Sequence, residues 1–313
     1  MSECCVKNDA TGLAAIRTKT EPIKTNDIVP LNLCVGDGSS KNEHARPGNL
    51  DSPGWKVAVH DAEPAKRGEV RLRFLGSGDN FGSGGRFQAC IHIDAGANRF
   101  LLDCGASSLI AMKRAGISTA AVDVILISHL HGDHFGGIPF FILDAQLISR
   151  REAPLVIAGP PGLTQRVKEA MEVFYPGSSA VERKFRIDYV ELAEGESATI
   201  GGLTVFPVRV IHGSGAPSYA LRVECAGRII AYSGDTEWTA ALCTVTDGAD
   251  LFICESYFFE KQMKNHINYR TLMAHRAELK CKRLILTHMG EEILSRLEEI
   301  EPEVAEDGME VIL

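Results

Sequence analysis

Residues 129–134 constrain this chain more than any other segment, because they place four metal-binding side chains within six positions. The segment reads His-Leu-His-Gly-Asp-His, follows the apolar residues 124–127 and precedes a predicted helix that begins at Gly137. Three imidazoles and a carboxylate in such proximity repel one another once the histidines are protonated, unless a cation holds them as neutral or anionic ligands. We therefore interpret the segment as a metal-binding turn between a strand and a helix.

The spacing within this turn is suited to two metal ions. In an extended strand end, residues i and i+2 point the same way, so His129 and His131 can reach one ion. Asp133 and His134, on the following turn, approach a second ion. Imidazole and carboxylate ligands without thiolate favour zinc, with manganese or iron as the alternatives. Neither ion is fully ligated by this segment, so further ligands are expected from elsewhere in the chain.

The same segment resembles the H-x-H-x-D-H signature of the metallo-β-lactamase fold superfamily. Members of that superfamily take further ligands from later loops, and this sequence offers three candidates after apolar strands: His212, Asp235 and His288. The resemblance implies one metal on His129, His131 and His212, a second metal on Asp133, His134 and His288, and a bridging Asp235. Two divalent ions about 3.5 to 4 Å apart can activate a bridging hydroxide at neutral pH. Asp133 is then also a candidate to orient the attacking water.

A further histidine follows from a second local resemblance. Glu255-Ser256-Tyr257, followed by Asn265-His266, resembles the segment of ribonuclease Z-like and related phosphodiesterase members that supplies a histidine beside the leaving group. A positioned imidazole can protonate a departing alkoxide, a step worth roughly 10²- to 10⁴-fold. We expect His266 to be this general acid, the alternative being a surface-loop histidine. Glu255 is either a hydrogen-bond partner of a site histidine or an ordinary strand-end carboxylate.

The local motifs are closest to those of ribonuclease Z-like and small-molecule phosphodiesterase members. Ribonuclease Z inserts the arm that grips transfer RNA between its third histidine and its bridging aspartate, whereas here the corresponding residues 213–234 already contain two predicted strands. We therefore expect hydrolysis of a small phosphodiester and no processing of transfer RNA. A lactonase or β-lactamase-like hydrolase of carboxylic esters or amides is the alternative, and an inactive metal-binding scaffold is a third.

Strand-like and helix-like segments alternate from Glu69 onward. Strands are predicted at 70–75, 89–93, 99–103, 122–128, 155–158, 185–191, 203–211, 218–223, 228–233, 251–255, 283–287 and 310–313. Helices are predicted at 107–115, 137–149, 163–174, 236–242, 269–279 and 292–299. This α/β pattern favours two packed sheets flanked by helices over one doubly wound sheet. The resemblance implies the αβ/βα sandwich of two mixed β-sheets flanked by helices, which is the metallo-β-lactamase fold.

The two ends of the chain differ from its centre. Residues 1–66 contain five prolines and little periodicity, so we interpret them as an irregular or partly disordered N-terminal extension to a hydrolase domain at 67–313. Residues 291–313 hold nine acidic residues and one base, which equals the whole formal charge of −8. We interpret this acidic C-terminal segment as a solvated helix face. The nearly neutral remainder offers no overall attraction to nucleic acid.

Several weaker features complete the analysis. The glycine-rich residues 75–82 lack the spacing of nucleotide-binding loops. The resemblance to the superfamily, which has a similar first loop, implies left-handed turns near the metals, the alternative being phosphate contact by the backbone amides. The loop around Tyr175 is a candidate lid or homodimer contact. Nine cysteines without a C-x-x-C pair indicate reduced thiols. Because the chain shows neither an apolar run of roughly 18 residues nor a secretory signal, we expect cytoplasmic localisation and no membrane association.

Overall fold

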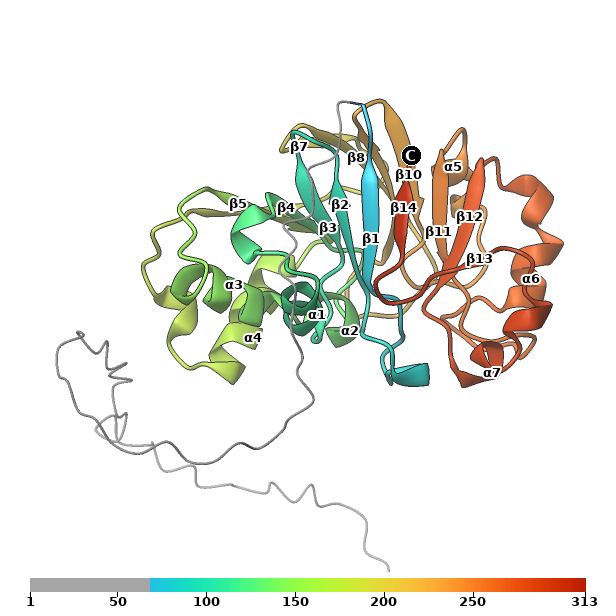
Figure 1. Cartoon of the computed structure of the whole chain (residues 1–313), viewed down its shortest axis with the longest axis horizontal. Coiled ribbons are helices and arrows are strands. Elements are labelled where there is room, and N and C mark those ends of the chain that lie inside the picture. Colours follow the sequence, from blue (N-terminus) through green and yellow to red (C-terminus); the bar gives the residue numbers. More distant parts are fainter. Residues whose placement is uncertain (1–67) are drawn as a thin grey trace, which may run out of the picture. The chain divides into compact units, whose positions relative to one another are not determined.

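The computed structural model describes residues 68–313, and the predicted extension at 1–66 lies outside them. The described chain forms two seven-stranded sheets (Figure 1). The first sheet has the order β14 (Glu310–Ile312), β1 (Arg71–Gly76), β2 (Cys90–Asp94), β3 (Arg99–Leu102), β4 (Val124–Leu126), β5 (Leu155–Gly159) and β6 (Ile187–Glu191). The second has the order β13 (Glu303–Val304), β12 (Arg283–Thr287), β11 (Leu251–Glu255), β10 (Arg228–Tyr232), β9 (Tyr219–Cys225), β8 (Leu203–Arg209) and β7 (Ala198–Ile200).

Both sheets are mixed. In the first sheet, β14, β1, β2 and β3 pair antiparallel, and β3 to β6 pair parallel. In the second sheet, β7 to β10 pair antiparallel, and β10 to β13 pair parallel. The parallel halves require crossover segments, which is where the helices lie.

The apolar runs of the central strands are explained by burial on both faces. In β4, Val124 and Leu126 pack into the core between the sheets, while Ile125 packs under the outer helices. In β11, Leu251 and Ile253 face the same central core and Phe252 faces outward. Strands covered on both sides lose the apolar–polar alternation of half-exposed strands, because each successive side chain enters a different core.

The helices cover the outer faces of the sheets. On the first sheet they are α1 (Ser108–Arg114), α2 (Gly132–Phe135), α3 (Ile138–Leu147) and α4 (Leu163–Phe174), and on the second they are α5 (Ala241–Thr246), α6 (Tyr269–Ala274) and α7 (Glu291–Leu294). Met112, Phe141 and Val167 anchor the first set, and Leu242, Leu272 and Ile293 anchor the second. No helix within residues 68–313 is long and apolar enough to cross a membrane.

The predicted fold class, two mixed sheets flanked by helices, is confirmed. Each predicted strand is present, and the structure adds β7 and β13, which are too short to show an alternating pattern. The helix predicted at 236–242 is wrong, since α5 begins only at Ala241. Residue Thr236 instead lies in a turn, where its backbone N–H donates to the Glu255 carboxylate.

The acidic C-terminal segment is not a single solvated helix face, which corrects the sequence interpretation. After α7 and a 3₁₀ turn at Leu297–Glu299, the chain joins the second sheet through β13 and the first sheet through β14. Glu303 pairs with Arg283 at 2.6 Å, and Glu310 pairs with Arg73. The buried side chains Ala305 and Val311 anchor the segment, and two of its acids, Glu303 and Glu310, lie on the edge strands β13 and β14.

Candidate metal centre

The seven predicted metal ligands come from four chain segments that meet where several strands end. The 129–134 segment follows β4 and overlaps α2, and the other three segments follow β8, β10 and β12. The side chains brought together are His129, His131, Asp133, His134, His212, Asp235 and His288. They fall into two adjacent groups.

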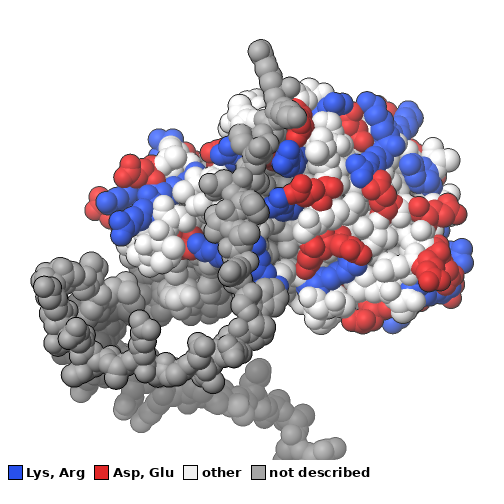
Figure 2. Space-filling model, viewed as in Figure 1, with Lys and Arg blue, Asp and Glu red and all other residues white. Residues whose placement is uncertain are grey.

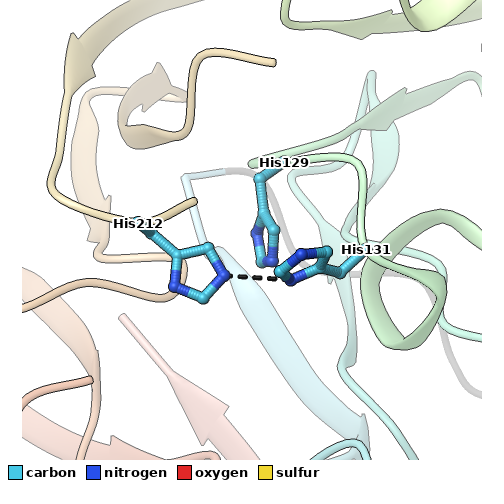
Figure 3. Close-up of side chains that lie close together, drawn as sticks. All are labelled: His129, His131 and His212. Carbon is cyan, nitrogen blue, oxygen red and sulfur yellow. Dashed lines mark hydrogen bonds between the residues drawn. The ribbon is translucent and has the colours of Figure 1, made fainter. Parts of the chain in front are cut away.

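The first group consists of His129, His131 and His212, and its ligand atoms all lie within 4.8 Å of one another. Figure 3 shows the three rings converging, with Nε2 of His212 at 3.0 Å from Nδ1 of His131. The His129 and His212 ring centroids are 4.6 Å apart. Three imidazole nitrogens converging on one point provide the ligand set of a tetrahedral cation site with a fourth position left for water or substrate.

The second group consists of Asp133, His134, Asp235 and His288, all of them buried. Nε2 of His134 lies 3.3 Å from a carboxylate oxygen of Asp133 and 3.3 Å from one of Asp235. Nε2 of His288 lies 3.2 Å from Asp133 and 3.5 Å from Asp235. Two carboxylates and two imidazoles therefore share one small volume.

Asp235 joins the two groups. Besides its contacts in the second group, its Oδ2 lies 3.8 Å from Nε2 of His129 and 3.9 Å from Nε2 of His212. A carboxylate has two oxygens and about four lone pairs, so it can serve two cations at once. Asp235 therefore contacts side chains of both groups.

Unpaired buried atoms support a cation at this place. Nε2 of His129, Nε2 of His134, Nδ1 of His288 and Oδ1 of Asp235 have no hydrogen-bond partner within the described chain. Buried polar atoms are normally paired, since leaving one unpaired costs about 1 to 3 kcal/mol. Nitrogen and oxygen donors without thiolate fit a divalent cation of the zinc, manganese or iron type. The histidine–aspartate cluster could therefore hold metal.

The electrostatics of the cluster also favour positive charge. Burial alone would raise the pKa of Asp235, but the imidazoles of His134 and His288 lower it well below its usual value. Burial lowers the pKa of His288, yet Asp235 and Asp133 outweigh this and raise it to about 9. Protons and divalent cations thus compete for the same buried groups.

One residue that sequence reasoning missed supports the second group. Asp103 is fully buried at the end of β3, and its Oδ2 lies 2.6 Å from Nδ1 of His134. The same oxygen accepts hydrogen bonds from Ser128 Oγ at 2.8 Å and the Tyr232 hydroxyl at 2.7 Å. Its φ of 58° is a left-handed conformation that costs energy for a residue other than glycine. A polar residue closing an apolar strand is the only sequence signal for this role.

Replacing Asp103 with asparagine should weaken metal binding about 10- to 100-fold, because a neutral amide no longer fixes the His134 ring or supports its basicity. Competition against a chromogenic chelator measures this affinity. Asp94→Asn is the matched control, since Asp94 is a largely buried carboxylate in the same sheet that contacts Arg99 and the Gly96 amide instead. Equal affinities for the two variants would contradict the role of Asp103.

His266 lies beside the metal cluster and contacts Glu255. Its Nδ1 is 3.0 and 3.2 Å from the two Glu255 oxygens and 4.0 Å from Asp235. Burial raises the pKa of Glu255 to about 7. Burial lowers the pKa of His266, but the Glu255 carboxylate outweighs this and raises it. The geometry also allows His266 to act as a metal ligand together with His212 and Asp235. An experiment therefore has to distinguish a role as metal ligand from a role as general acid.

A cavity of about 340 Å³ opens over the cluster. Its lining residues are Asn80, Phe81, His131, Gly132, Asp133, His212, Asp235, Tyr257, Met263, Lys264, Asn265, His266 and His288. Phe81 and Met263 form an exposed apolar rim, and Lys264 adds a cation. The Tyr175 loop contributes none of these lining residues, and the Tyr175 ring lies near Phe140 with centroids 6.0 Å apart.

Comparison with known proteins places this arrangement in a family. The family model described as Anti-Pycsar protein Apyc1 matches residues 70–303. The chain belongs to this family. The matched range contains both ligand groups, His266 and all the strands from β1 to β12.

This member of the Apyc1 family is also related to ribonuclease Z. It is 28% identical over 273 residues to ribonuclease Z from Agathobacter rectalis, covering 70% of this chain and 87% of that protein. It is 25% identical over 303 residues to the enzyme from Methanosarcina acetivorans, covering 77% and 97%. The relationship expected from the sequence is confirmed.

Solved structures give the same fold. The human tRNase Z short form aligns with a TM-score of 0.61 and 25% identity, covering 77% of this chain and 98% of that chain. A diphosphatase of the PhnP family aligns with a TM-score of 0.61 and 18% identity, covering 77% and 97%. The metallo-β-lactamase fold protein YhfI from Bacillus subtilis aligns with a TM-score of 0.61, 20% identity and coverage of 78% and 100%. The chain of this Apyc1-family member therefore has the metallo-β-lactamase fold of a hydrolase.

Two features of this Apyc1-family member concern its ability to bind a large polyanion such as transfer RNA. Between His212 and Asp235 the chain forms β9 and β10, which pair with each other inside the second sheet. On the face that Figure 2 shows, basic and acidic side chains are interspersed over the described surface. A broad one-signed basic surface of the kind that attracts a polyanion is not seen on that face.

Proposed function

We propose that this protein is a metal-dependent hydrolase of a small phosphodiester. In this proposal, His129, His131 and His212 would hold one divalent cation, Asp133, His134 and His288 would hold a second, and Asp235 would be a ligand shared by both. The proposal rests above all on His266, which lines the cavity beside both ligand groups while its Nδ1 contacts Glu255. Phosphodiester cleavage expels an alkoxide, which benefits from a proton donor at that place.

The cations, zinc by preference with manganese or iron as alternatives, would lower the pKa of a bound water and neutralise charge that develops on the phosphoryl oxygens. Asp133 lines the cavity and contacts His288, and we assign it the orientation of the attacking water. Since Glu255 engages Nδ1 of His266, Nε2 is the nitrogen left to donate a proton to the leaving oxygen. Lys264 in the lining favours an anionic substrate.

Several observations favour a small substrate over transfer RNA. The cavity holds about 340 Å³, which is the size of a small-molecule site. Strands β9 and β10 occupy the stretch where ribonuclease Z-like proteins would insert an arm for transfer RNA. Relatives nevertheless include ribonuclease Z, so precursor transfer RNA belongs among the tested substrates.

Hydrolysis of a lactone or β-lactam is the second candidate, because the same activated water can attack a carbonyl and the cavity rim is apolar. A tyrosine in the place of His266 would favour that chemistry. Tyr269, the nearest candidate in sequence, is 3% exposed and packs against Phe259 with ring centroids 5.0 Å apart. Its burial in the core supports the phosphodiesterase proposal over the lactonase.

A parallel turnover screen tests the proposal. The purified protein, with its metal content measured, would be assayed on bis(4-nitrophenyl) phosphate, a lactone, a β-lactam and a precursor transfer RNA. We expect about two divalent ions per chain and metal-dependent turnover of the phosphodiester at least about 100-fold above the other substrates. Preferential turnover of the lactone or β-lactam would replace this proposal by the second candidate, and a metal-loaded protein without any turnover would indicate a binding scaffold.

A further inference from the structure

Residues 77–87, here called the glycine-rich loop, contact both the metal centre and the substrate cavity. Asn80 and Phe81 line the cavity. The carbonyl oxygen of Ser77 accepts a hydrogen bond from the backbone N–H of His288 at 3.0 Å and another from the Thr287 hydroxyl at 3.3 Å. His288 has a left-handed φ of 54°, so its backbone depends on such contacts. A shift of this loop would therefore move a candidate metal ligand and the cavity wall together.

Asp307 holds the two ends of this loop. Its Oδ1 accepts hydrogen bonds from the backbone N–H and the hydroxyl of Ser77, both at 2.9 Å. Its Oδ2 accepts the backbone N–H of Phe87 at 2.7 Å. Hydrogen bonds to a charged acceptor are the stronger kind, and three of them here connect positions ten residues apart in the loop.

The backbone beside Asp307 is anchored to the first sheet. Gly308 donates its N–H to the Phe74 carbonyl at 2.7 Å, and Phe74 donates to the Met309 carbonyl at 3.0 Å. Figure 1 shows the connection between β13 and β14 crossing the end of β1, from which the loop departs. The Asp307 carboxylate is thus presented from a fixed support to a loop that carries no regular strand of its own.

We propose that Asp307 is a positioning residue for the metal centre. It holds Ser77 so that the Ser77 carbonyl supports His288, and it holds the loop ends so that Asn80 and Phe81 face the substrate. This assignment rests on the proposed function, since it takes His288 as a ligand and the cavity as the substrate site. The acidic C-terminal segment then contributes to the catalytic apparatus through Asp307.

The test compares Asp307→Asn with Glu306→Gln. Asparagine keeps one carbonyl oxygen but places an amide N–H₂ where an oxygen accepted hydrogen bonds. Glu306 is the preceding exposed acid, so its variant removes the same charge at almost the same place without touching the loop. Asp307 is exposed as well, so its replacement leaves no buried cavity.

For Asp307→Asn, we expect faster amide hydrogen exchange in residues 77–87, about tenfold weaker cation binding against a chromogenic chelator, and about tenfold higher KM for the phosphodiester. At saturating metal, kcat should return to within about threefold of wild type. Ser77→Ala removes the hydroxyl that donates to Asp307 and accepts from Arg86, and it keeps the backbone N–H that donates to Asp307. It should shift the same three quantities by about two- to threefold, and it provides the test if the first variant folds poorly.

Two results would overturn the role of Asp307. One is hydrogen exchange, cation affinity and KM all matching those of Glu306→Gln. The other is a lowered Tm with cation affinity and KM unchanged, which would make Asp307 a residue of general stability. Hydrogen exchange and cation affinity can be measured without turnover. A wild-type protein that binds metal without cleaving phosphodiesters would therefore refute the proposed function, while these two measurements would still test the positioning role of Asp307.

Discussion

Asp235→Asn should reduce bound metal from about two ions per chain toward one and lower phosphodiester turnover by at least about 10³-fold. The carboxylate lies within 4.0 Å of nitrogens on His129, His134, His212 and His288, so it is the charge that both candidate cation sites share. An amide has the same shape but no negative charge, and it offers one accepting oxygen instead of two. Losing the shared charge removes both a ligand and the electrostatic stabilisation on which attack depends.

Elemental analysis and steady-state kinetics on the same preparation measure the two effects. His275→Ala is the control, because it removes an imidazole that stacks on Trp238 and bonds Glu278, outside both ligand groups. The control should retain its metal and its activity. An Asp235→Asn protein with two ions and near-normal turnover would refute the bridging role.

His266→Ala should leave metal content unchanged and slow substrates with poor leaving groups by about 10²- to 10³-fold, while a 4-nitrophenyl ester slows less than about threefold. The reason is that a departing alkoxide requires a proton, whereas 4-nitrophenolate is stable without one. A plot of log kcat against the pKa of the leaving alcohol measures the effect, and its slope should steepen in the variant.

Glu255→Gln provides the matched comparison for His266. It leaves the imidazole in place but removes the buried carboxylate that contacts Nδ1 at 3.0 Å. We expect Glu255→Gln to slow substrates with poor leaving groups more than substrates with good ones, as His266→Ala does, but by a smaller factor. Equal losses on good and poor leaving groups would contradict a general-acid role for His266, and loss of metal from His266→Ala would instead identify the imidazole as a ligand.

The fold could be predicted from local sequence because its signals are short-range, and the resemblance of residues 129–134 to a known signature indicated which later strand ends to examine for ligands. The apolar strand at 124–127 leads directly into the histidine-rich turn, and each later candidate follows its own strand. Strand ends in parallel arrangement meet at one edge, so a pattern of strand followed by ligand carries tertiary information. The helix predicted at 236–242 failed for a related reason, since those residues form the turn that presents Asp235 and contacts Glu255.

The residues that support the centre were not predictable in the same way. Asp103 contacts His134 across 31 positions, and Asp307 contacts Ser77 across 230. Neither contact leaves a periodicity or spacing in the sequence, because a hydrogen bond between distant segments depends only on where the fold places them. The acidic C-terminal segment illustrates this, since its charges suggested a solvated helix while its backbone closes both sheets.

The sequence by itself determined the fold class and the kinds of atoms available to a metal, because burial patterns and ligand chemistry are properties of short segments. The tertiary structure decided that Asp235 contacts side chains of both ligand groups, that His266 contacts Glu255, that Asp103 contacts His134, and that Asp307 contacts Ser77. These relations depend on distances of 2.6 to 3.9 Å between side chains from different segments of the chain, and only the packing of the two sheets sets such distances.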